Sequence, residues 1–291
     1  KSNVLKLTLA TCSHPEDSFS YENDGFVICG ICDALIEAEV VDADGKSLGY
    51  ADIESAIKLA QENEGSTVKL MSEGVSESIT VTGGRFTVDF NGKKVFYQFA
   101  VDGGDVTFTS SVKQADVETL ISKIEVTGAD AKVTIDGKIK LGSVTLTSGT
   151  LTVNSTQGYI KELSIIGGNA VIDGANIDAL SINGGATVIN GANIDALKTY
   201  GGDTVINDVN ADSLTMCDNR SGGSEYNISI VSGMFGSFTC ENGSNYTLGR
   251  AIASGSVVSA DSMNGITVYT YEAIQTMTST YRIFVDKCNH K

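Results

Sequence analysis

Beyond residue 66, the chain is dominated by short runs in which apolar and polar residues alternate. Alternation with a period of two turns one set of side chains inward and the other outward, so each run predicts a half-buried β-strand. A recurrent frame has two apolar residues around a polar one, then Asp or Asn, then a small residue, as in 133–137 and 151–155. These runs predict short strands joined by tight corners.

The same phrase occurs three times, at 167–180, 184–197 and 201–214, with a step of 17 residues. Self-similarity at a fixed period, in sequence rich in Val, Ile, Gly and Asn, is typical of a β-solenoid in which each repeat forms one coil. A coil can bury its apolar face only against the coil above or below it. We therefore expect an all-β parallel β-helix in which equivalent apolar residues of successive coils stack in file.

Residues 50–64 carry the one convincing helical pattern. The apolar residues fall at i, i+3, i+4 and i+7 and make a single stripe, which consists of Ile53, Ala56, Ile57 and Ala60. Gly65 follows as a C-terminal cap. One amphipathic helix ahead of the coils fits a lid over the first coil, because a bare strand edge invites aggregation.

The patterns divide the chain into three parts. Residues 1–49 form a small Cys/His-containing β module, residues 50–265 form the β-helix with its capping helix, and residues 266–291 form capping strands and the start of a further module. The last part contains Cys288-Asn-His290, which repeats a Cys-x-His pattern of the first part. This repetition predicts tandem modules in a longer parent chain; the alternative is that Cys288 pairs with another cysteine of this chain.

Four soft metal ligands lie close together in the first part, as Cys12-x-His14 and Cys29-x-x-Cys32. Zinc takes four such ligands in a tetrahedron, and a site filled by protein ligands is structural rather than catalytic. We therefore expect Cys12, His14, Cys29 and Cys32 to hold one structural zinc ion. The alternative is a disulfide in an oxidising exterior, with His14 incidental.

The charge of the chain narrows the range of partners. The formal net charge is −16 and the sequence pI is about 4.4. Nucleic acids and anionic membranes both require a basic surface, so neither is an expected partner. The longest apolar runs are too short to span a bilayer, so we expect no membrane insertion. The acidic balance suits an exported surface protein or one that meets divalent cations.

Three segments resemble the opening of a known domain type. They are Tyr50-Ala-Asp-Ile-Glu-Ser-Ala-Ile57, Gly65-Ser-Thr-Val-Lys-Leu70 and Val88-Asp-Phe-Asn-Gly-Lys93. A short helix and two such strands are similar to the start of right-handed, pectin-lyase-like parallel β-helix domains of Gram-positive bacterial cell-surface proteins, where small Cys/His modules also occur. The resemblance implies a right-handed β-helix that is extracellular, on the bacterial surface or secreted. It does not decide activity, because such domains serve as both enzymes and adhesins.

Equivalent polar side chains of the repeats form columns along the expected solenoid. One column can form a ladder of side-chain amide hydrogen bonds and consists of Asn176, Asn193 and Asn210. A second column consists of Asp178, Asp195 and Asp212. Carboxylates about 4.8 Å apart repel by roughly 0.9 kcal/mol per pair, which bound calcium would relieve. The alternative is a solvated turn with splayed carboxylates.

Further candidates for ligand binding lie on the outer surface of the coils. An outward column of valines makes a small apolar strip that suits a partner-binding face and consists of Val171, Val188 and Val205. Tyr200 offers a ring for sugar stacking, and Arg220 lies near the aspartate column. The alternatives are a loop that covers the valines and ordinary packing for the tyrosine.

The expected solenoid body lacks the residue sets of common hydrolases. Both histidines, His14 and His290, lie in Cys-x-His motifs, and neither a Ser/His/Asp set nor an Asp-Asp pair emerges. We therefore expect a non-catalytic cell-surface adhesin or stalk module that binds an extracellular glycan or a host or matrix protein. One alternative is a polysaccharide lyase or glycoside hydrolase that acts on an acidic polysaccharide through the aspartate column and Arg220. Another is a pure spacer module.

Overall fold

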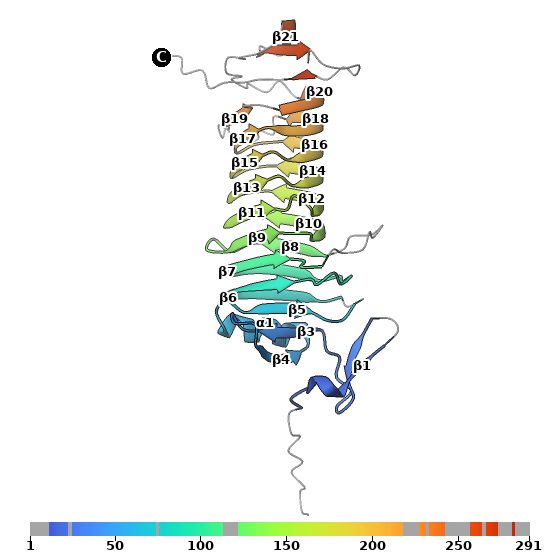
Figure 1. Ribbon diagram of the computed structural model, residues 1–291. Coiled ribbons are helices and arrows are strands. Elements are labelled where there is room, and N and C mark those ends of the chain that lie inside the picture. The colour runs from blue at the N-terminus through green and yellow to red at the C-terminus, as the bar shows by residue number, and fades with distance from the viewer. Residues whose placement is uncertain are drawn as a thin grey trace, which may run out of the picture.

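The protein is a parallel β-solenoid of about 7 turns, which forms a straight stack in Figure 1. The structure is a computed structural model and describes residues 12–22, 25–73, 76–112, 122–217, 227–230, 233–241, 257–263, 266–272 and 281–282. The all-β solenoid predicted from the sequence is confirmed. No helix in these ranges is both long and apolar enough to cross a membrane.

Two sets of parallel strands form the flanks of the stack. The first flank contains β5 (Thr67–Leu70), the second halves of β6 (Ser78–Asp89) and β7 (Gln98–Thr109), β9 (Lys132–Asp136), β11 (Thr150–Asn154), β13 (Asn169–Asp173), β15 (Ala186–Asn190), β17 (Asp203–Asn207) and β19 (Asn227–Ile230). The second flank contains the first halves of β6 and β7, then β8 (Lys123–Val126), β10 (Lys140–Leu146), β12 (Tyr159–Ile165), β14 (Asn176–Ile182), β16 (Asn193–Thr199), β18 (Val209–Cys217) and β20 (Gly233–Glu241).

Equivalent residues of successive coils lie in file. Ile172 is the register partner of Ile189, which is the partner of Ile206, and all three side chains are fully buried. Because a register shift of one residue would turn these side chains to solvent, burial holds each strand in its place. The 17-residue repeat is therefore one coil, as predicted.

The glycine pair that opens each repeat is required where the coils turn. The second glycine of the pair, Gly168, Gly185 or Gly202, has a φ of 72°, 74° or 81°, a left-handed conformation that other residues rarely adopt. A Cβ on any of them would also collide with a glycine carbonyl oxygen in the preceding coil. Two independent constraints therefore select glycine at this corner.

Two ladders of side-chain hydrogen bonds follow another corner. In the predicted ladder, Asn193 Nδ2 donates to Asn176 Oδ1 at 3.1 Å, and the backbone of Asn210 continues the column. A second ladder was not predicted. In it, Asn190 Nδ2 donates to Asp173 Oδ1 at 2.6 Å and Asn207 Nδ2 donates to Asn190 Oδ1 at 2.9 Å. Each bond joins neighbouring coils and adds to the backbone pairing.

The helix α1 (Ile53–Glu62) lies over the first coil (Figure 1) and buries the predicted apolar stripe. Asp52 caps its N-terminus, because the Asp52 Oδ1 atom accepts from the Ser55 backbone N–H at 2.8 Å. The helix is shorter than the predicted range of 50–64. Its first predicted residues belong to a strand, and Asn63, two residues before the predicted cap Gly65, ends it.

The N-terminal end of the stack begins earlier in the sequence than predicted. The strand β3 (Ala38–Val41) pairs antiparallel with β4 (Ser47–Ala51) and with β5. Residues 38–51 therefore extend the first flank of the solenoid, although the sequence pattern placed most of them in a separate module that ends at residue 49. Only long-range pairing reveals this, since the strands look alike in sequence.

The C-terminal end also differs from the prediction. The strands β21 (Val257–Met263) and β22 (Ile266–Glu272) form an antiparallel hairpin. The predicted boundary at residue 265 therefore falls inside this hairpin. The strand β23 (Tyr281–Arg282) pairs with β22 and, at one residue, with β20. Cys288 and His290 lie outside the described residues, so their predicted roles stay predictions.

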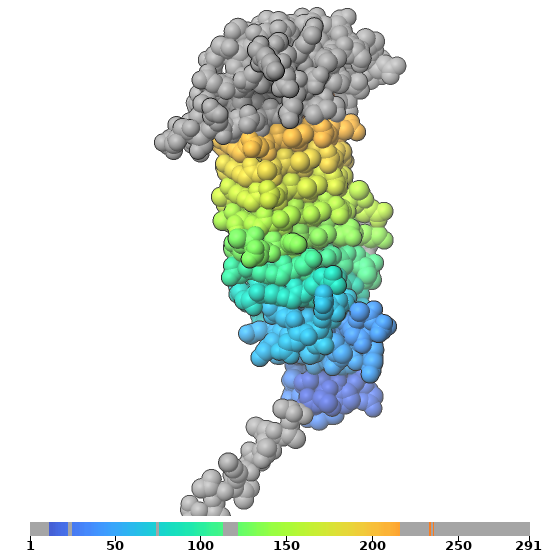
Figure 2. Space-filling model, turned by 90° about the vertical axis from the view of Figure 1, so that its left-hand side faces the viewer, coloured from blue at the N-terminus to red at the C-terminus, as the bar shows by residue number. Residues whose placement is uncertain are grey.

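The Cys/His module lies beyond the helical lid, at the dark blue end of the molecule in Figure 2. It contains the short 3₁₀ helix η1 (Glu16–Ser18) and the antiparallel strands β1 (Phe19–Tyr21) and β2 (Val27–Cys29). Its small core joins residues of the module to residues of the first flank and consists of Val27, Cys29, Ile36, Cys12, Phe19, Tyr50 and Met71.

Candidate metal centre

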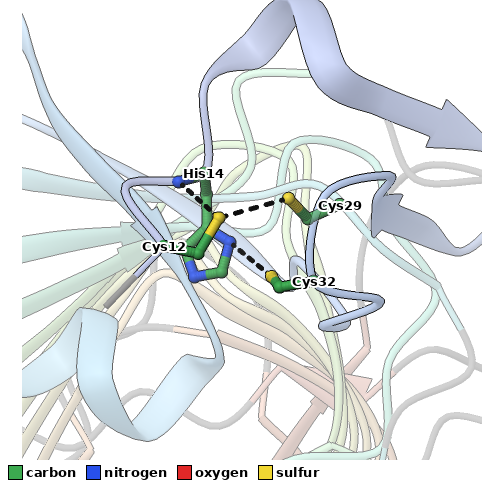
Figure 3. A group of neighbouring side chains, drawn as sticks. All are labelled: Cys12, His14, Cys29 and Cys32. Atoms are coloured by element: carbon green, nitrogen blue, oxygen red, sulfur yellow. Dashed lines mark hydrogen bonds between the residues drawn. The ribbon is translucent and has the colours of Figure 1, made fainter. Parts of the chain in front are cut away.

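Figure 3 shows that the structure brings together the four residues predicted to bind zinc. One ligand atom from each of Cys12, His14, Cys29 and Cys32 lies within 4.8 Å of the others. In the described ranges, this is the only group of three or more His, Cys, Asp or Glu residues that could hold a metal ion. The Cys-x-His and Cys-x-x-Cys pairs therefore meet at one point, as the sequence predicted.

Local backbone geometry sets the direction of each ligand. Cys29 ends β2, and a tight turn follows, since the Asp33 N–H donates to the Cys29 carbonyl at 2.8 Å and the Cys29 N–H donates to the Ala34 carbonyl at 2.9 Å. Asp33 has a φ of 57° in this turn. His14 has a φ of 48°, and its N–H donates to Cys12 Sγ at 3.4 Å. Both pairs of ligands are therefore held by compact turns.

Two distances between ligand atoms are close to the edges of a tetrahedral metal site. The Cys12 and Cys29 Sγ atoms are 3.7 Å apart, and Cys32 Sγ is 3.5 Å from His14 Nδ1. A tetrahedron with Zn–S of about 2.3 Å and Zn–N of about 2.0–2.1 Å has S–S edges of about 3.8 Å and S–N edges of about 3.6 Å. A disulfide requires about 2.05 Å between sulfurs. The three cysteines of the cluster are free in the structure, which favours the metal site over the disulfide.

The surroundings favour the thiolate form of Cys29, which is the form that binds metal. Hydrogen bonding with His14, and then with Ser18 at 3.5 Å, lowers the pKa of Cys29 to about 5, although burial opposes the shift. Ser18 was not predicted as part of the site. The pKa of Cys32 is raised: a backbone hydrogen bond from Ala34 lowers it, but burial and the neighbouring Cys12 and Cys29 outweigh that effect.

The aspartate column is present but does not gather into a comparable group. Backbone register places Asp178, Asp195 and Asp212 on successive coils, with Asp178 half-buried and the other two exposed. The Tyr159 hydroxyl donates to Asp178 Oδ2, a contact that was not predicted. Burial and then the hydrogen bond to Asp178 raise the pKa of Tyr159 to about 12. Calcium binding by these aspartates stays a prediction.

The valine strip is part of a longer outward column on the first flank. Val171, Val188 and Val205 are register partners and are half-buried. The same column holds threonines in the earlier coils, namely Thr67, Thr87, Thr107, Thr134 and Thr152. Tyr200 is half-buried at the corner after β16, and Arg220 lies outside the described residues. Along this one outward column, threonine in the earlier coils is thus replaced by valine in the three coils of the strip.

Comparisons with protein-family models, with curated proteins and with solved structures found no match for this chain. The pectin-lyase-like relationship implied by the sequence resemblance therefore remains a prediction, while the solenoid itself follows from the strand pairing.

Proposed function

We propose that this chain is a non-catalytic, rigid module of an extracellular bacterial surface protein that serves as a stalk or adhesin. The observation that carries the proposal is the parallel pairing of successive coils from β5 to β20. At about 4.8 Å per coil, about 7 turns make a rod about 34 Å long. Outward side chains then repeat at the coil spacing along the rod, as an extended ligand requires.

The adhesive face that we propose is the valine strip. Three aliphatic side chains in file are flanked by the ladder of Asp173, Asn190 and Asn207. An apolar line beside hydrogen-bonding groups suits an extracellular protein or glycan. Binding to arrays of matrix proteins and glycans tests this. Val188→Lys should abolish the hits, whereas Thr134→Lys, a control substitution at the same column position two coils before the strip begins, should retain them.

Retention of every hit by Val188→Lys would reject the strip as the binding face. Calcium-dependent release of unsaturated sugars from an acidic polysaccharide would instead contradict the non-catalytic proposal and support a lyase. If the protein binds no component of either array, the result would support a spacer function for the rod.

We further propose that the Cys/His cluster binds one zinc ion in a structural role. The match of the S–S and S–N distances to a tetrahedron supports zinc, and four protein ligands leave no open position for substrate. Elemental analysis of protein purified without chelators should give one zinc per chain, and Cys32→Ser should lose it. As a control, Ser20→Ala changes a hydroxyl of the same module outside the cluster and should keep the zinc. Protein without zinc but with a Cys12–Cys29 disulfide would contradict this proposal.

A further inference from the structure

We propose that a metal ion in the Cys/His cluster also clamps the helical lid onto the first coils, so that β2 and α1 open only as one unit. The inference rests on the metal site proposed above. It concerns the stability of the solenoid end, about which the cluster alone says nothing.

The first link joins the metal-binding strand β2 to Ser72, two residues after the end of β5. Cys29 is fully buried in the small core described above, where it packs with Val27 and Ile36. The Val27 N–H donates to Ser72 Oγ at 2.9 Å, and Ser72 Oγ donates to the Ile36 carbonyl at 2.6 Å. Ser72 is itself fully buried. Movement of β2 away from the coils would therefore leave buried polar groups without partners.

The second link joins the same segment to the lid. Glu37 follows Ile36 directly, and only 2% of its surface is exposed. Its Oε2 atom accepts from the backbone N–H of Ile53, the first residue of α1, at 2.7 Å. Its Oε1 atom accepts from the hydroxyl of buried Tyr97, in the connection between β6 and β7, at 3.3 Å. One carboxyl group thus holds the helix start against the coils.

The backbone of Glu37 connects the two links. Its N–H donates to the Ala51 carbonyl at 3.0 Å, and its carbonyl accepts from the Met71 N–H at 2.8 Å. Metal ligand, small core, Ser72 and Glu37 therefore form a continuous buried path to α1. Segments connected in this way open cooperatively, and a ligand bound to one part stabilises the whole unit.

Amide hydrogen exchange of the full chain at several buffered concentrations of free zinc tests the proposal. Opening that releases zinc is suppressed by a factor of 1 + [Zn]/Kd. Amides of α1 should therefore gain about tenfold protection for each tenfold rise in zinc above Kd, in parallel with amides of β2. Amides of β15, several coils away, should show no dependence on zinc.

Cys32→Ser removes a ligand without touching the lid, and zinc should then leave the protection of α1 unchanged. Protection of α1 that still follows zinc in this variant would overturn the proposal, because zinc would be acting elsewhere. In the unaltered chain, a response of β2 without one of α1 would overturn the clamp but leave the metal site standing. Absence of a response in both would overturn the clamp and the metal site together.

Discussion

Gly185 and Gly191 lie in one coil, and both have positive φ values, of 74° and 59°. A Cβ on Gly191 would meet no atom within 4 Å. A Cβ on Gly185 would collide with backbone atoms of Gly167 and Gly168 in the preceding coil. At the residue scale, glycine is thus required at one position by backbone conformation alone and at the other also by the contact between coils.

Substitution of these glycines by alanine separates the two effects. Gly191→Ala should cost about 1–2 kcal/mol of unfolding free energy, the price of a left-handed conformation. Gly185→Ala should cost clearly more, because the coils must also move apart. Urea unfolding of both variants measures the difference, and equal losses would show that the coils do not approach as closely as described.

At the element scale, alternation along each strand decides which residues carry the stability. In β15, Ile189 is fully buried and its neighbour Val188 is half-buried on the outer face. The same division holds in β13 and β17, whose residues are in register with those of β15. The strand is therefore stabilised from one side by the core and from its edges by neighbouring coils.

Alanine substitution in β15 tests this division. Ile189→Ala should lower the free energy of unfolding by about 2–5 kcal/mol, because it opens a cavity in the core. Val188→Ala, one residue away, removes half-exposed methyl groups and should cost less than about 1 kcal/mol. Thermal or denaturant unfolding measures both, and a larger loss for Val188→Ala would mean that the strand faces the other way.

At the scale of the whole molecule, stability depends on how the ends of the rod are closed. Glu37 lies where the Cys/His module, α1 and the first coils meet. Burial raises the pKa of this carboxyl above its ordinary value, although the hydrogen bond from Ile53 opposes the shift, and the nearby Glu77 adds to the rise. The folded protein therefore holds this proton more tightly than the unfolded chain does.

This difference predicts a dependence of stability on pH. The stabilisation linked to protonated Glu37 is complete below a pH of about 4.5, the value for the unfolded chain, and is lost as pH rises through the higher pKa of the folded state. Relative to Glu37→Gln, the unaltered protein should therefore lose stability over a pH range that begins near 4.5 and extends through the higher pKa of the folded state. Denaturant unfolding of both proteins across this range measures the effect. A constant difference between the two proteins would refute the prediction. Glu39→Gln is the control, because Glu39 lies in β3, which begins directly after Glu37, and its side chain is half-exposed.

Much of the fold and part of the site could be predicted because their signals are local or periodic. The repeat placed Ile172, Ile189 and Ile206 in one file, and the spacing of Cys12, His14, Cys29 and Cys32 was sufficient to group them. The hydrogen bonds of Glu37, Ser72 and Tyr159 could not be predicted. Each joins residues that lie in different coils or modules, and no spacing rule relates them.

The repeat in the sequence was sufficient to predict the solenoid, since a fixed period of apolar and small residues can be buried only when equivalent residues stack. It also determined which four side chains are suited to a metal. Three features came from the folded structure alone: β3 and β4 extend the first flank, the four ligand atoms lie within 4.8 Å of one another, and Glu37 connects the cluster to α1. These features depend on contacts between segments that are distant in the sequence. Such contacts depend on how the segments pack and bury their side chains in the folded chain, and no local sequence pattern specifies them.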